Sequence, residues 1–121
     1  MKIKKFEEIE AWKRARELTK VIYRISSLNE FSKDWALRDQ IKKSAISVMS
    51  NIAEGFDSGF KNEFARFLGI SRRSASEIQS QLYVALDQLY ISEYEFKKIY
   101  EETEEIRKMI TGFIKYLKSI Q

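Results

Sequence analysis

The chain contains no proline and only four glycines among its 121 residues. Because proline breaks helices and glycine marks turns, their scarcity leaves few points at which a helix could end. Long, uninterrupted helices are therefore favoured, and an all-β fold is disfavoured. A chain of this length predicts one domain, with a core large enough to need no cross-links.

Apolar residues recur at steps of three and four in four separate stretches, the spacing that places side chains on one face of a helix. These stretches predict helices at about residues 8–27, 33–54, 61–89 and 93–120. The third helix has the longest apolar seam, which is heptad-like. Its members are Phe64, Leu68, Ser71, Ala75, Ile78, Leu82, Ala85 and Leu89. Four helices joined by short links predict an all-α, up-and-down antiparallel four-helix bundle.

Local signals predict where these helices begin and end. Ser32 or Asp34 can cap the second helix by accepting hydrogen bonds from its first N–H groups. Gly55 falls where the same helix would need a left-handed residue after its last turn. The Phe-Asp-Ser-Gly-Phe stretch that follows is the expected loop. Ser92 and Glu95 form a capping box at the start of the fourth helix.

The chain has no cysteine and no histidine, which removes disulfides, thiolate catalysis, imidazole acid–base chemistry and the common zinc sites. We expect no enzyme, no cofactor and no bound metal. Carboxylates in the fourth helix could be imagined as metal ligands, but di-iron bundles also use histidine. Most of them lie off the apolar seam, so we interpret them as a solvated half-helix that matches the helix dipole. They are Glu101, Glu102, Glu104 and Glu105.

Composition also bears on location and partners. No apolar run approaches the ~18 residues of a membrane span. The opening MKIKKFEEIE lacks the apolar region of a signal peptide. We therefore expect a cytoplasmic protein that does not enter a membrane. The formal net charge of +4 permits a polyanionic partner without requiring one.

The outward side of the first predicted helix carries four cations, which we call the basic stripe. The stripe consists of Lys13, Arg16, Lys20 and Arg24. Further candidate cations lie on the second and third helices. They are Lys42, Lys43, Arg66, Arg72 and Arg73. Such residues have two interpretations, a solvated helix face or a set of contacts to nucleic-acid phosphates.

Some apolar side chains of the first and third helices fall outside the core seams. They are Ile9, Trp12, Ile70 and Val84. Small residues line one side of the third helix and would let another helix approach closely. They are Gly69, Ser76 and Ser80. We interpret these residues together as a second packing surface, which predicts a homo-oligomer.

Residues 47–56, SVMSNIAEGF, resemble the S-x-x-S-N-I-A-E-G-F signature of four-helix-bundle proteins encoded in intervening sequences of bacterial large-subunit ribosomal RNA genes. Supporting similarities lie on both sides of this segment. FEEIEAW at residues 6–12 is similar to F-x-x-L-x-V-W, QIKKSA at 40–45 to Q-I-R-R-A-A, and EFARFL at 63–68 to E-F-x-R-F-L. The resemblance covers the first three predicted helices and most of the chain.

This resemblance implies a left-handed four-helix bundle that assembles into a ring, typically a pentamer. It also implies similarity to accessory proteins of diversity-generating retroelements, which bind nucleic acid and a reverse transcriptase. The chain departs from the family pattern at two places. Arg72-Arg73-Ser74 replaces a usual Gly-Ser pair, which adds positive charge, and Ser32 stands where the family often has proline.

Within the signature, Asn51 and Glu54 are three residues apart and share a helix face, while Gly55 is expected to supply a positive φ. An exposed carboxylate at a helix C-terminus is disfavoured by about 0.3 to 1 kcal/mol. Glu54 therefore predicts a basic or hydrogen-bond-donating partner, such as one across a subunit interface, in preference to a catalytic role.

Two functions stay open at this point. The chain could be a homo-oligomeric module that binds RNA or DNA phosphates through its basic residues without reading bases. Alternatively, it could be a protein-interaction scaffold for a partner such as a reverse transcriptase, with basic faces that only confer solubility.

Overall fold

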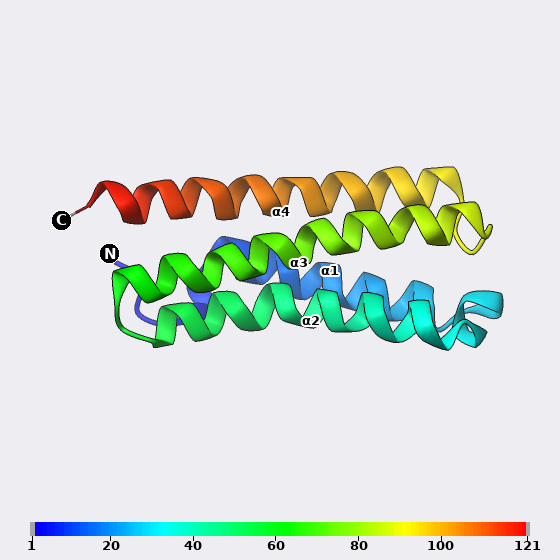
Figure 1. Ribbon diagram of the computed structural model, residues 1–121, viewed down its shortest axis with the longest axis horizontal. Coiled ribbons are helices and arrows are strands. Elements are labelled where there is room, and N and C mark those ends of the chain that lie inside the picture. The colour runs from blue at the N-terminus through cyan, green and yellow to red at the C-terminus, as the bar shows by residue number, and fades with distance from the viewer. Residues whose placement is uncertain (1, 121) are drawn as a thin grey trace.

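The computed structural model describes residues 2–120, and within this range the chain forms four long helices and two short 3-10 turns (Figure 1). The helices are α1 (Glu10–Ser26), α2 (Trp35–Asp57), α3 (Lys61–Asp87) and α4 (Glu93–Ser119). The 3-10 turns are Phe6–Glu8 and Asn29–Lys33. None of these described helices is both long and apolar enough to cross a lipid bilayer.

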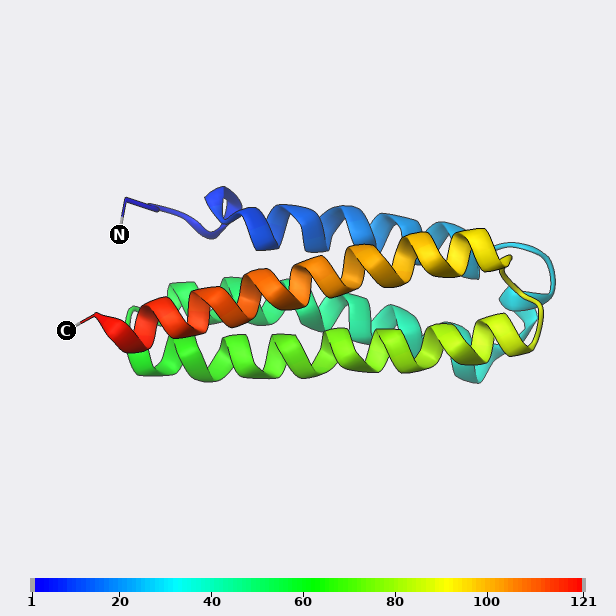
Figure 2. The same ribbon diagram turned by 90° about the horizontal axis from the view of Figure 1, so that it is seen from above.

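Consecutive helices run in opposite directions, with the α1–α2 and α3–α4 connections at one end of the bundle and the α2–α3 connection at the other (Figure 1). Both α1 and α3 pack against α2 and α4. In the view of Figure 2, α4 runs between α1 and α3. Hence α1 and α3 occupy diagonal corners. The all-α, up-and-down four-helix bundle is confirmed, and its left-handed sense stays a prediction.

The apolar seams meet along the bundle axis and form one continuous core. The predicted seam of α3 is buried from Phe64 to Ala85. Two polar side chains of this core donate to backbone carbonyls of helices. Thr103 Oγ1 donates to Ile99 O at 2.8 Å, and Ser71 Oγ donates to Val48 O at 2.6 Å. These bonds let polar side chains take part in a packed core.

The start of α1 corrects one part of the predicted second packing surface. The helix begins at Glu10, because Ile9 is extended and the turn Phe6–Glu8 folds against α1 and α2. Ile9 is only 1% exposed, and the half-buried Trp12 ring meets Phe6 edge-on at 5.2 Å. Both side chains belong to the subunit's own packing. For Ile9 the prediction of a position off the core was wrong, because helical periodicity does not apply to a residue that precedes the helix. Trp12 lies within α1 and is partly buried against the core.

Gly55 also has a different role from the one predicted. It lies inside α2, which continues to Asp57, and the left-handed glycine is Gly59, with φ of 79°. A Cβ at Gly55 would stand 2.8 Å from Phe67 Cβ and 2.9 Å from Phe64 Cδ1. Both distances are shorter than real Cβ contacts allow. Gly55 is therefore required for the close approach of α2 and α3, and it does not end the helix.

Side-chain caps fix the starts of two helices. Of the two predicted candidates for α2, Asp34 is the cap, since its Oδ1 accepts from Leu37 N at 3.1 Å. Its Oδ2 accepts from the Tyr90 hydroxyl at 3.0 Å, and this bond raises the pKa of Tyr90. Ser92 and Glu95 form the predicted capping box of α4.

The C-terminus of α3 contains a strained residue. Leu89, predicted as a core residue, is 87% exposed and has a left-handed φ of 63°. Its N–H donates to Leu86 O, and the next N–H, of Tyr90, donates to Ala85 O at 2.9 Å, which is the Schellman arrangement. Glycine is the usual residue at this position because it has no Cβ to clash.

Leu89→Gly is expected to raise the free energy of unfolding by about 1 kcal/mol, because the left-handed conformation costs leucine roughly that much. Urea denaturation followed by circular dichroism measures the change. Gly59→Ala is the reciprocal control and should lower the free energy of unfolding, because Gly59 has a positive φ. A Cβ there would meet nothing within 4 Å, so the backbone conformation alone would cause the loss. A less stable Leu89→Gly variant would contradict the assignment of strain.

Candidate nucleic-acid interface

The glutamates of α4 do not converge on a metal site. Glu102 Oε2 pairs with Arg14 Nη2 at 2.8 Å, and Glu104 Oε1 pairs with Arg107 Nη1 at 2.8 Å. Glu105 faces Lys108 at 3.7 Å. Across residues 2–120, no group of three or more potential ligands could hold a metal ion. Glu101 and Glu105 are exposed, as the interpretation of a solvated half-helix expects, whereas Glu102 and Glu104 are half-buried in their ion pairs.

The basic stripe is present on α1 as predicted, and all four of its side chains are exposed. Lys20 pairs with Glu17 at 2.9 Å, and the Arg16 guanidinium lies 6.0 Å from the centre of the Trp12 ring. A shallow depression of about 390 Å³ adjoins them. Its lining residues are Glu7, Trp12, Lys13, Arg16, Glu17 and Lys20.

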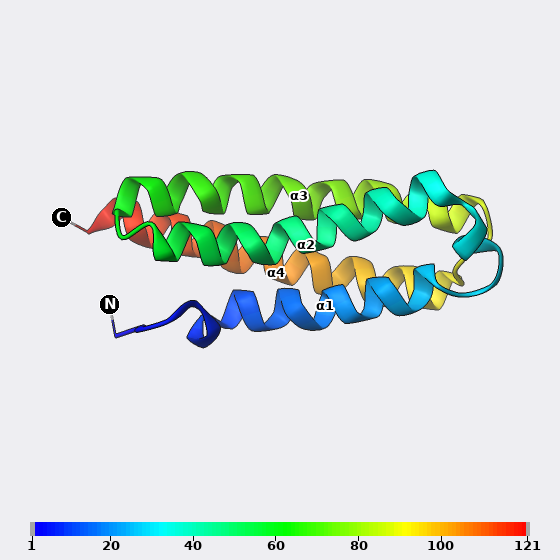
Figure 3. The same ribbon diagram turned by 90° about the horizontal axis from the view of Figure 1, so that it is seen from below.

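Lys42 extends this cationic surface from α1 to α2. Its Nζ lies 4.7 Å from the centre of the Tyr23 ring, across the line where the two helices meet. Figure 3 shows α1 and α2 side by side on one side of the bundle. We call the basic stripe together with Lys42 the α1/α2 basic face. Within the described chain, Lys13, Arg16, Arg24 and Lys42 form no ion pair.

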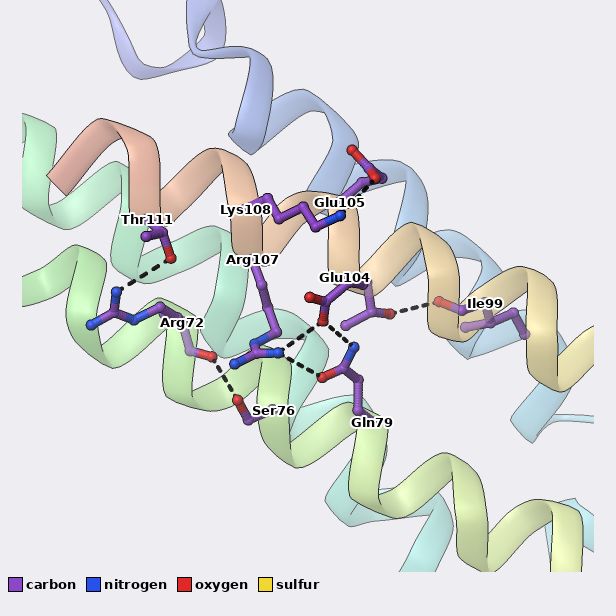
Figure 4. Close-up of polar contacts among 10 residues, drawn as sticks. Arg72, Ser76, Gln79, Ile99, Glu104, Glu105, Arg107, Lys108 and Thr111 are labelled. Atoms are coloured by element: carbon purple, nitrogen blue, oxygen red, sulfur yellow. Dashed lines mark hydrogen bonds and ion pairs between the residues drawn. The ribbon is translucent and has the colours of Figure 1, made fainter. Parts of the chain in front are cut away.

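The remaining candidate cations lie elsewhere on the bundle. Arg72 turns toward α4 and donates to Thr111 Oγ1 at 3.3 Å (Figure 4). Arg66 pairs with Glu63 at 3.1 Å and holds the pKa of that carboxyl below its usual value. Arg73 on α3 and Lys43 on α2 are exposed. Because α3 is diagonal to α1, a single subunit cannot present all nine predicted residues on one surface.

A polar network between α3 and α4 was not predicted from the sequence (Figure 4). Gln79 is 6% exposed, and its Nε2 donates to Glu104 Oε1 at 3.0 Å. Arg107 Nη1 donates to the same carboxylate and to Gln79 Oε1. The Gln79 bond, with help from Arg107, lowers the pKa of Glu104. The available signal was a glutamine directly after the seam residue Ile78. The network fixes how α3 and α4 align.

The predicted oligomer contacts are accessible on the subunit. Val84 is 44% exposed, Ser76 and Ser80 are exposed, and Ile70 is partly exposed. A Cβ built on Gly69 would meet nothing within 4 Å. This helix surface is thus only partly covered within the described subunit.

Asn51 and Glu54, both from the SVMSNIAEGF segment, have different surroundings. Asn51 Nδ2 donates to Ser47 O at 2.8 Å and to Ser47 Oγ at 2.9 Å. Ser47 Oγ in turn bonds Ser74 Oγ of α3 at 2.7 Å, so Asn51 supports the α2–α3 contact. Glu54 is exposed in the last turn of α2, and its carboxylate has no ion-pair partner among residues 2–120. Its predicted partner stays a prediction.

Comparison with known proteins places this bundle in a family. A solved structure is similar over 87% of this chain and 95% of its own, with a TM-score of 0.80 and 24% identity. It is a protein with unknown function from the S23 ribosomal protein family of Bacteroides thetaiotaomicron VPI-5482, and the likeness concerns the fold alone. No curated protein matches the chain. The family model of the 23S rRNA-intervening sequence protein matches residues 7–112, so this protein belongs to that family.

Proposed function

We propose that this is a cytoplasmic, non-enzymatic, homo-oligomeric protein, most simply a pentameric ring, that binds RNA or DNA without reading bases. The α1/α2 basic face carries the binding. The supporting observation is that five cations lie together on this face and four of them, Lys13, Arg16, Arg24 and Lys42, have no ion-pair partner in the described chain, while the fifth, Lys20, pairs with Glu17. Cations without carboxylate partners are available to neutralise phosphates.

Neutralising phosphates releases condensed counterions from the nucleic acid, so this mode of binding depends strongly on salt. It depends little on sequence, because phosphate contacts carry no base information. Anisotropy of labelled RNA and duplex DNA, titrated with the protein at several salt concentrations, tests the proposal. With five cations engaged, log K against log salt should fall with a slope of about −4.5 on duplex DNA. The absence of any association at low salt would refute it.

The oligomer is a separate part of the proposal. Its support is the partly apolar surface of α3 that contains Ile70, Val84 and Gly69, which the rest of the described subunit leaves at least partly exposed. Light scattering measures the mass in solution against the 14.4 kDa of one chain. A monomer at all concentrations would rule out the ring.

One observation favours the alternative function, a scaffold for a protein partner such as a reverse transcriptase. A groove of about 610 Å³ lies between α1 and α4, with Leu18, Val21, Ile25 and Ile99 among its apolar lining. Such a groove could accept the apolar face of a partner helix. If the protein is a scaffold and does not bind nucleic acid, a variant with reversed charges on the basic stripe should still bind the protein partner.

A further inference from the structure

Aromatic rings accompany the cations of the α1/α2 basic face. Trp35, the first residue of α2, is 70% exposed, and Tyr23 of α1 is 42% exposed. Trp12, half-buried, lies beside Arg16 at the other end of α1. Rings of this size are normally buried, so exposed ones on a charged surface call for an explanation.

The spacing places these rings along the line of the cations. Trp35 precedes Lys42 by about two helical turns and therefore lies on the same side of α2, roughly 10 Å away along the axis. Lys42 contacts the Tyr23 ring, which brings Tyr23 onto the same surface from α1. Trp12 precedes Tyr23 by about three turns. Aromatic rings thus lie beside cations at both ends of the α1/α2 basic face.

Trp35 does little for the fold of the subunit. Its ring takes part in none of the aromatic or cation–π pairs found among residues 2–120. The cap of α2 is the neighbouring Asp34. The exposed ring of Trp35 is consequently available to a ligand.

We propose that the α1/α2 basic face binds single-stranded nucleic acid, RNA or DNA, with one base stacked on Trp35 and another on Tyr23. This inference rests on the proposed function, and it specifies single strands as the form of RNA or DNA that is bound. A duplex hides the faces of its bases within its own stack, whereas a single strand can present them to aromatic side chains. The cations then hold the phosphates between stacked bases. Stacking of this kind tolerates any base, which agrees with binding that does not read sequence.

Fluorescence of Trp35 gives a direct test. The chain has two tryptophans, so Trp12→Phe leaves Trp35 as the only one and keeps a ring against Phe6. The probes are an RNA strand and a DNA strand of about 12 nucleotides, a usual single-strand site size, and each strand annealed to its complement. Single strands should quench Trp35 emission, and the duplexes should leave it nearly unchanged.

Affinity measurements give the second test. Trp35→Ala should weaken single-strand binding by roughly 5- to 150-fold, the range for loss of one stacked base, and should leave duplex binding within about twofold. Trp35→Phe should recover most of the loss. Phe60→Ala is the matched control, because Phe60 is 71% exposed and belongs to the α2–α3 connection, at the opposite end of the bundle from the α1–α2 connection that Trp35 follows (Figure 1). Its single-strand affinity should not change.

Four results separate this inference from the proposed function. Equal affinity for single strands and duplexes, with no effect of Trp35→Ala, would overturn single-strand recognition while phosphate binding stands. Equal losses of single-strand and duplex binding would also overturn it. If light scattering gave Trp35→Ala a smaller particle mass than the unchanged protein, the Trp35 side chain would be assigned to a contact between subunits instead. No binding of any probe at low salt would remove the proposed function, and this inference with it.

Discussion

Reversing the basic stripe with Lys13→Glu, Arg16→Glu, Lys20→Glu and Arg24→Glu should weaken nucleic-acid binding roughly 100-fold or more at low salt. Each cation that contacts a phosphate contributes a counterion-release term, and a carboxylate in its place adds repulsion. The salt dependence of the remaining binding should become shallow. All four side chains are exposed, so the variant should keep its helical circular dichroism and its thermal transition.

A matched variant distinguishes a local surface from total charge. Lys43→Glu, Arg66→Glu, Arg72→Glu and Arg73→Glu change the net charge by the same amount, but none of these residues lies on the α1/α2 basic face. This variant should lose only the modest affinity that arises from long-range attraction, which salt screens. Equal losses in the two variants would show that net charge, and not the α1/α2 basic face, attracts the nucleic acid.

Gly55→Ala and Gly69→Ala should change stability in opposite directions, although both replace a glycine inside a helix. At Gly55 the new methyl group would meet Phe67 Cβ at 2.8 Å, and this atom cannot move without its helix. Overpacking of a core contact typically costs about 1 to 3 kcal/mol. The cost exceeds the roughly 1 kcal/mol that alanine gains over glycine in a helix, so the free energy of unfolding should fall.

At Gly69 a Cβ would meet nothing within 4 Å inside the subunit, so only the gain in helix propensity applies to the stability of one isolated subunit. The free energy of unfolding should rise by about 0.5 to 1 kcal/mol. Urea denaturation of both variants under one set of conditions measures the difference. A stabilised Gly55→Ala variant would mean that α2 and α3 can separate at low cost, and that Gly55 is not needed for their contact.

Much of the candidate interface could be predicted from the sequence. The four cations of the basic stripe share one side of α1 because helical periodicity places them there, and α1 is a regular helix along this stretch. Lys42 is different, because its neighbour Tyr23 comes from another helix. The same limit applies to Arg72, whose contact with Thr111 depends on how α3 packs on α4.

The helix ends show a similar division. The capping box at Ser92 was predictable because both of its hydrogen bonds join residues three apart. The end of α2 was not, because Gly55 was interpreted as a local signal when its role is to let Phe64 and Phe67 approach from α3. The prediction for Ile9 was wrong for the same reason, since the burial of Ile9 depends on contacts with the core and not on the periodicity of α1.

The sequence by itself determined the four helices, their antiparallel order and the basic stripe, because each follows from spacing within one helix and from the shortness of the links. Only the tertiary structure decided which cations share a face, why Gly55 is a glycine, and which aromatic rings stay exposed. These properties depend on pairs of residues that are far apart in sequence, and the periodicity of a single helix contains no information about which residue of another helix will face it.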